Sequence, residues 1–239
     1  MIGSAVRAVL LDIDDTLVDT RAAFSAAISA VVARWMPGSD ESVPAAALAH
    51  WVADRHGHFR AYTRGELTFV EQRRRRAVDL HLALGGPSLD GETFRVWEEH
   101  YERAFRGAWR AFEEVAGFLD RLEAAGLAIG AITNAGLAHQ RDKLDRVGLK
   151  ERIPVLVTVD DLGLGKPDPR VFALACSRLG VAAREAVYVG DELDVDARGA
   201  RDAGLTGVWI DRRGRREEAG TVDVPAVETL TELADRWGI

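Results

Sequence analysis

Five apolar runs, each followed by polar residues, constrain the fold of this chain more than any other feature of its sequence. They are rich in Val, Ile and Leu and cover residues 6–13, 127–133, 154–159, 186–190 and 206–210. Segments with helical periodicity separate them. Continuous apolar strands that alternate with helices are typical of a parallel sheet buried on both faces. The sequence therefore predicts an α/β fold.

The segment between the first two runs follows a different pattern. From about residue 20 to residue 110 the apolar residues recur with helical spacing, and no strand is predicted. Phe94, Trp97, Tyr101 and Phe105 fall along one face of a predicted helix, where they are expected to form the core of this segment. We therefore expect a core domain from residues 1–19 and 111–239, with an all-helical domain from residues 20–110 inserted in it.

Composition excludes several classes of protein. The chain has 239 residues, of which 47% are hydrophobic and 29% charged, as in ordinary globular proteins. A net charge of −7 argues against nucleic-acid binding, and no apolar run is long enough to span a membrane. The N-terminal apolar stretch is too short for a secretory signal, which favours the cytoplasm. Cys176, the single cysteine, is expected to be a small core residue. We expect a monomer or a homodimer.

The stretch LLDIDDTLVDT crowds four carboxylates behind the first apolar run, at Asp12, Asp14, Asp15 and Asp19. Carboxylates so close together repel one another unless a positive group joins them, and a divalent cation is the obvious candidate. Asp12 and Asp14 are two residues apart, so in an extended chain their side chains point to the same side. One could serve as nucleophile and metal ligand while the other handles protons.

Polar groups also follow the later runs. In open α/β sheets the ligand binds outside the carboxyl ends of the strands, so these groups should share one crevice. Thr133 and Asn134 could hold phosphoryl oxygens through a hydroxyl and a backbone N–H, or simply cap a helix. Lys166 is one of only three lysines beside 28 arginines, which suggests a need for a compact point charge. Asp191 and Asp196 offer hard oxygen ligands suited to Mg²⁺, or form a charged loop.

Taken in order, these segments resemble the four motifs of the haloacid dehalogenase-like (HAD) hydrolase superfamily. DIDDT is similar to its first motif, Thr133 to its second, Lys166 in GKPDP to its third, and GDELDVD to its fourth. The resemblance covers the whole sheet domain. It implies a Rossmann-like core with the first strand central and a helical cap between the first and second motifs.

The resemblance also implies a role for each motif residue. Asp12 would attack phosphorus and form an aspartyl phosphate, and Asp14 would protonate the leaving oxygen and then activate water. Mg²⁺ would be held by Asp12, the backbone carbonyl of Asp14, and Asp191. Thr133 and Lys166 would bind the transferring group. The function expected is Mg²⁺-dependent hydrolysis of a small phosphorylated metabolite.

The fourth motif contains two further polar residues near the predicted metal ligands, Asp196 and Glu192. Asp196 is expected to support the site by orienting Lys166 or a metal-bound water. Glu192 stands where the family usually has serine or asparagine. The sequence therefore does not show which groups form the hydrogen bonds that support the metal ligands.

Other activities occur on the same fold. Dehalogenases of the superfamily lack a carboxylate at the position of Asp14, since a halide leaves without a proton, so Asp14 favours phosphoryl chemistry. A sugar phosphomutase uses the same two aspartates and stays open as an alternative. A non-catalytic phosphate-binding or regulatory module is disfavoured, because every motif residue is present.

Substrate choice is expected to come from the inserted helices. The cap side chains best able to meet an anionic or hydroxylated leaving group are His56, His58, Arg60, Arg73 and Arg76. Arg76 is the preferred substrate-binding candidate among them. Each of these residues has an alternative role without substrate contact. A histidine could simply lie at a helix end, and an arginine could form an ion pair with Glu66, Glu71 or Asp79 on the cap surface.

Overall fold

The computed structural model describes residues 5–217 and 219–239 and divides into two compact units. The divisions fall between Asp19 and Thr20 and between Arg110 and Ala111. We call Thr20–Arg110 the helical unit and the remainder the core unit.

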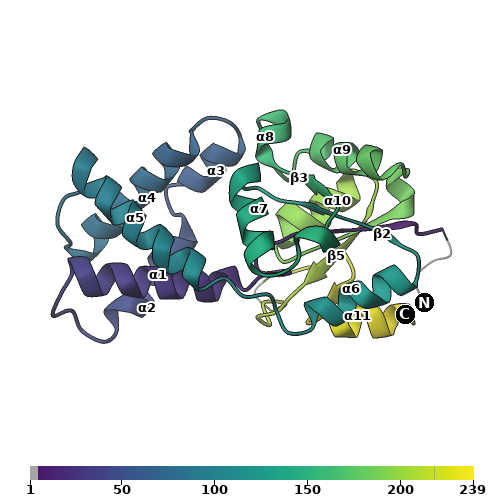
Figure 1. Cartoon of the computed structure of the whole chain (residues 1–239), viewed down its shortest axis with the longest axis horizontal. Coiled ribbons are helices and arrows are strands. Elements are labelled where there is room, and N and C mark those ends of the chain that lie inside the picture. Colours follow the sequence, from purple (N-terminus) through teal and green to yellow (C-terminus); the bar gives the residue numbers. More distant parts are fainter. Residues whose placement is uncertain (1–4, 218) are drawn as a thin grey trace. The chain divides into compact units, whose positions relative to one another are not determined.

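A six-stranded sheet forms the centre of the core unit (Figure 1). Its strands are β1 (Ala8–Leu11), β2 (Ala128–Ile132), β3 (Val155–Val157), β4 (Ala186–Gly190), β5 (Thr206–Ile210) and β6 (Ala226–Val227). Their order in the sheet is β3-β2-β1-β4-β5-β6, and every neighbouring pair is parallel. β1 lies between β2 and β4, with Leu10 opposite Gly130 on one side and Tyr188 on the other. The predicted α/β, Rossmann-like sheet is confirmed.

All five apolar runs form strands, but two details differ from the sequence-based expectation. The run 154–159 ends as a strand at Val157, because the side chain of Thr158 exchanges hydrogen bonds with Asp161 and begins the short helix α8 (Val159–Leu162). The two-residue strand β6 was not predicted. It is too short to show an alternating pattern, and it forms because Val227 pairs with Ile210 at the edge of the sheet.

Helices cover both faces of the sheet. Beside α8 the core unit contains α6 (Val115–Ala124), α7 (Leu137–Arg146), α9 (Pro169–Leu179), α10 (Gly199–Asp202), α11 (Leu230–Trp237), and the short η1 (Lys150–Arg152), η2 (Ala183–Glu185) and η3 (Leu193–Arg198). Figure 1 shows α6 and α11 on one side of the sheet and α9 and α10 on the other. Among the described residues, no helix combines the length and apolar character that crossing a membrane requires.

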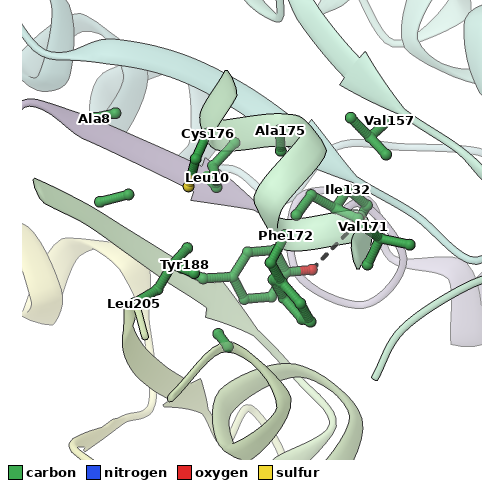
Figure 2. Close-up of a cluster of buried hydrophobic side chains, with 12 residues drawn as sticks. Ala8, Leu10, Ile132, Val157, Val171, Phe172, Ala175, Cys176, Tyr188 and Leu205 are labelled. Atoms are coloured by element: carbon green, nitrogen blue, oxygen red, sulfur yellow. Dashed lines mark hydrogen bonds between the residues drawn. The ribbon is translucent and has the colours of Figure 1, made fainter. Parts of the chain in front are cut away.

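A buried cluster joins α9 to the sheet (Figure 2). Phe172 packs edge-on against Tyr188, with ring centroids 5.2 Å apart and planes at 86°. Cys176 is 4% exposed beside Leu10 in the same cluster, as expected for a core residue. Figure 2 shows the Tyr188 hydroxyl at the edge of the cluster, where it donates to the carbonyl of Ile132 at 3.2 Å. Tyr188 thus has its ring in the core and its hydroxyl at the polar end of the strands.

The helical unit, all of whose residues the structure describes, contains helices and turns and no strand. Its helices are α1 (Thr20–Trp35), α2 (Val43–Ala53), α3 (His58–Thr63), α4 (Phe69–Leu84) and α5 (Gly91–Gly107). The aromatic face of α5 is buried, and stacking continues along it from Trp97 to Tyr101 at 5.2 Å and from Tyr101 to Phe105 at 5.6 Å. These aromatics form the core of the unit, as the sequence predicted.

Candidate active site

The first acidic loop begins directly after the central strand. The backbone N–H of Asp12 donates to the carbonyl of Val189 in β4 at 2.8 Å, which fixes Asp12 at the end of the sheet. The chain then turns sharply: Leu17 N–H donates to Ile13 O at 3.0 Å, and Asp15 has a left-handed backbone with φ of 57°. Aspartate tolerates this conformation better than most residues do. The turn leaves Asp12 5% exposed at the strand tip.

Lys166 lies at the centre of a buried charge cluster. Its Nζ forms an ion pair with Asp12 and lies 2.8 Å from both Asp196 Oδ1 and the Tyr188 hydroxyl. Burial alone would lower the pKa of Lys166, but the charges of Asp12 and Asp196 outweigh burial and raise that pKa above its ordinary value. Lys166 is therefore a fixed cation beside the first carboxylate. Asp196 occupies the position that orienting Lys166 requires.

Asn134 fixes the backbone of Lys166. Its Oδ1 accepts from Lys166 N–H at 2.6 Å, and its Nδ2 donates to Lys166 O at 3.0 Å. A Cβ atom on Gly165 would come within 2.3 Å of Asn134 Oδ1, so a side chain at that position would break the clamp. The side chain of Asn134 thus joins the second motif to the third. A contact between its backbone N–H and a phosphoryl group stays a prediction.

Asp14 has a cationic partner of its own, which the sequence reasoning missed. Its carboxylate forms an ion pair with Lys143 and accepts from Gln140 Nε2 at 2.6 Å, and the same Nε2 donates to Thr133 Oγ1 at 2.8 Å. Gln140 and Lys143 are three residues apart on α7, so they share a face, and both are buried. The rarity of lysine that drew attention to Lys166 applied equally to Lys143.

Replacing Lys143 by methionine should lower kcat by roughly tenfold or more, because Asp14 then loses the cation that holds its carboxylate, and proton transfer depends on positioning. Lys150→Met is the matched control. Lys150 is 52% exposed and 3.3 Å from Asp145, so its ion pair should contribute little. Steady-state kinetics on protein shown to be folded by circular dichroism checks this. Wild-type kcat in folded Lys143→Met would contradict the positioning role.

Three carboxylates at the strand tips have the arrangement of a metal site. Asp12, Asp191 and Asp196 each offer an oxygen, and these oxygens lie within 4.8 Å of one another. Burial, opposed in part by Lys166, raises the pKa of Asp12 to about 8; burial, Glu192 and the neighbouring aspartates raise that of Asp191 well above its ordinary value. Lys166 offsets only part of this negative charge. Hard oxygen donors with uncompensated charge fit Mg²⁺.

The surroundings of Asp191 hold its backbone from two sides. Its carbonyl accepts from Trp209 Nε1 at 2.8 Å and from Arg215 Nη2 at 2.6 Å. Glu192 directs its side chain outward, 56% exposed, while its backbone N–H donates to Asp196 Oδ2 at 3.0 Å. The hydrogen bond from residue 192 to Asp196 thus comes from the main chain. The unusual side chain at Glu192 does not disturb it.

The arginine-rich loop after β5 ties the first and fourth motifs together. Arg213 forms an ion pair with Asp15, and Arg212 Nη2 donates to Thr16 O at 2.7 Å. The buried carboxylate of Asp211 accepts from backbone N–H groups of this loop, including Arg215 at 2.9 Å. Sequence reasoning placed the loop at the strand tips but assigned it no role.

Arg76 is turned into the helical unit itself. Its Nη2 donates to the carbonyl of Trp51 at 2.7 Å, and its guanidinium carbon lies 4.1 Å from the centroid of that indole. Arg73 is also buried, 3.0 Å from Glu102. The alternative considered for Arg76, an ion pair on the surface of the helical unit with one of three named acids, is therefore wrong. The three acids named as its possible partners contact other residues. Glu66 pairs with Arg64, Glu71 accepts a hydrogen bond from Thr68, and Asp79 contacts His56 and His58. A substrate contact by Arg76 stays a prediction.

Known proteins resemble the chain in sequence and in fold. Phosphoserine phosphatase of Thermus thermophilus is 40% identical over 113 residues, 47% of this chain and 45% of that protein, so the match spans less than half of its length. N-acetylmuramic acid 6-phosphate phosphatase of Pseudomonas aeruginosa is 30% identical over 200 residues, 83% of this chain and 79% of that one. The HAD hydrolase YfnB of Bacillus subtilis, solved with bound magnesium, gives a TM-score of 0.81 at 22% identity, covering 98% of this chain and 99% of that one.

The four motifs and the sheet that positions them agree with the family assignment made from sequence. Residues 6–204 match the family described as haloacid dehalogenase-like hydrolases, and this range contains Asp12, Thr133, Lys166 and Asp191. The chain belongs to the haloacid dehalogenase-like hydrolase family.

Proposed function

We propose that the chain is a phosphomonoester hydrolase that uses Mg²⁺ and acts on a small phosphorylated metabolite. The observation that carries this proposal is the pair of aspartates with separate partners: Asp12 beside Lys166, and Asp14 beside Lys143. A second carboxylate held next to the first is what protonation of an alkoxide leaving group requires. The phosphatase names of the relatives support the same class of reaction.

In the proposed reaction Asp12 attacks phosphorus in line, and the P–O bond to the leaving group breaks as the Asp12–phosphorus bond forms. Asp14 donates a proton to the departing oxygen and then takes one from the water that hydrolyses the phosphorylated aspartate. Lys166 and Thr133 hold the equatorial oxygens, where fixed positive charge and hydrogen bonds stabilise the transition state.

Asp12, Asp191 and the backbone carbonyl of Asp14 are the groups that would hold Mg²⁺. A bound cation would offset the repulsion between the attacking carboxylate and the anionic phosphate. Lys166 remains the cation fixed by the protein itself, and Asp196 keeps it in place.

The identity of the metabolite is open, because in the proposed reaction the groups at the strand tips would contact the phosphoryl group and the metal and would not read the rest of the substrate. Purified protein with Mg²⁺ should release inorganic phosphate from one or a few members of a panel of phosphorylated sugars, hydroxy acids, amino acids and nucleotides. Release of halide from 2-haloacids, or transfer of phosphate within a sugar phosphate without release, would instead favour the dehalogenase or phosphomutase alternatives. The cytoplasm, and a monomer or homodimer, remain the expected setting.

Arg76 is the proposed specificity residue of the helical unit. If Arg76 binds the leaving group, Arg76→Ala should lower kcat/KM for the preferred metabolite far more than for a small aryl phosphate, which lacks the groups that Arg76 would bind. Arg74→Ala is the control, because Arg74 is an exposed arginine of the same helix. An equal loss on both substrates would mean that Arg76 acts only through its packing on Trp51.

A further inference from the structure

A second cluster of metal-ligating side chains lies within the helical unit. His56 Nδ1 is 2.6 Å from Asp79 Oδ2, and His58 Nε2 is 2.9 Å from the same oxygen. The two imidazole centroids are 5.7 Å apart, and the three potential ligand atoms lie within 4.8 Å of one another. Nothing in the proposed phosphatase chemistry uses these groups together.

The local chain conformation holds the two histidines on one side of a turn. Between α2 and α3, Asp54 and Gly57 both have left-handed backbones, with φ of 40° and 67°. Asp54 Oδ2 accepts from Phe59 N–H at 3.0 Å, which closes the turn around His56 and places His58 at the start of α3. The turn therefore places both histidines near Asp79, and the contact of each imidazole with Asp79 Oδ2 holds the three ligand atoms together.

Asp79 supplies the third donor from a separate helix. It lies on α4, and its side chain is 22% exposed, against 18% for His58 and 63% for His56. One face of the cluster thus remains open to solvent. Two neutral imidazole nitrogens and one carboxylate are a donor set that favours Zn²⁺, Co²⁺ or Ni²⁺ over Mg²⁺.

We propose that His56, His58 and Asp79 form a site for a divalent transition metal, with Zn²⁺ the expected ion and water completing its coordination. Tetrahedral ligands around zinc stand about 3.3 Å apart, given Zn–N bonds of about 2.0–2.1 Å. The nitrogen–oxygen separations of 2.6 and 2.9 Å would have to open by about 0.7 and about 0.4 Å to reach this spacing. The bound ion would tie the turn before α3 to α4 and stabilise the helical unit. This site is independent of the proposed function.

Titration of the full chain with Zn²⁺ by calorimetry tests the site, with excess Mg²⁺ present to occupy the acidic cluster of the core unit. The wild type should bind Zn²⁺ at one site that His58→Gln and Asp79→Asn weaken by more than about tenfold, since loss of a ligand costs at least as much as loss of a supporting group. His100→Gln, which alters a histidine on α5, is the matched control and should bind as the wild type does. Asp191→Asn should also retain the site, because it removes a carboxylate of the core unit only.

Co²⁺ provides a second readout that depends on coordination. The wild type and Asp191→Asn should give the strong visible absorption of a tetrahedral or five-coordinate ion, and His56→Gln should lose it. His56 is mostly exposed, so this variant should fold, and metal-free circular dichroism checks that it does. Equal Zn²⁺ affinity in wild type and His58→Gln, Zn²⁺ binding that disappears with Asp191→Asn, or no Zn²⁺ binding by the wild type would each overturn the proposal.

Discussion

Asp12→Asn should abolish turnover and leave the fold intact. The amide has nearly the same shape as the carboxylate but cannot attack phosphorus, so the covalent step is lost. Lys166 keeps Asp196 and the Tyr188 hydroxyl, each at 2.8 Å, so it is not left unpaired. Removing one of three crowded acids also relieves repulsion. Phosphate release and thermal melting, measured on the same preparation, check both parts.

Two further variants calibrate that result. Asp14→Asn should lower kcat by on the order of 10²–10⁴, the usual contribution of a general acid or base. Asp194→Asn is the control from η3 in the fourth motif. The carboxylate of Asp194 is 79% exposed and pairs with Arg198, so this variant should change kcat little. Wild-type phosphatase activity in Asp12→Asn would rule out Asp12 as the nucleophile.

Removal of divalent metal should silence the enzyme as completely as Asp12→Asn. EDTA should stop phosphate release, Mg²⁺ should restore it, and Ca²⁺ should inhibit, because its coordination is larger and looser. Among the described residues, the cations paired with the buried carboxylates Asp12 and Asp191 are Lys166 and Arg215, and a metal ion would add to their charge. Full activity in metal-free buffer would reject the metal site.

The metal requirement should also depend on pH in a definite direction. Burial raises the pKa of Asp12 to about 8 although Lys166 opposes it, so as pH falls below that value protons compete increasingly with Mg²⁺ for this carboxylate. The Mg²⁺ concentration for half-maximal activity should therefore fall as pH rises from 6 towards 8. A requirement that grows with pH over this range would contradict the assignment of Asp12 as a ligand.

Sequence patterns predicted those features that local chemistry determines. Apolar runs identified five strands because a parallel sheet buried on both faces needs continuous hydrophobic residues. The polar ends of these runs predicted the site, because parallel strands bring their carboxyl ends to one edge. Asp12, Lys166 and Asp196 come together at that edge although 184 residues separate the first from the last.

Features that depend on packing between distant segments were not predictable in this way. The ion pair between Lys143 and Asp14 requires α7 to present a buried face to the loop after β1, which periodicity does not show. Arg76 shares a helical stripe with apolar residues, and only the structure shows that Trp51 receives it. The contact of His56 and His58 with Asp79 likewise depends on a turn whose left-handed residues the sequence does not reveal.

Chemical trapping of the phosphorylated residue tests the central claim most directly. Protein mixed with Mg²⁺ and an excess of a substrate that it turns over would be quenched during turnover and reduced with borohydride, which converts an aspartyl phosphate to homoserine. With an aryl phosphate, whose leaving group departs without help from an acid, Asp14→Asn should increase the trapped fraction, because hydrolysis of the intermediate still needs Asp14 as a base. We predict homoserine at position 12 in the digested protein and none in a sample without substrate. Homoserine at another acidic residue, with aspartate intact at position 12 in both proteins, would contradict the assignment of Asp12 as the nucleophile.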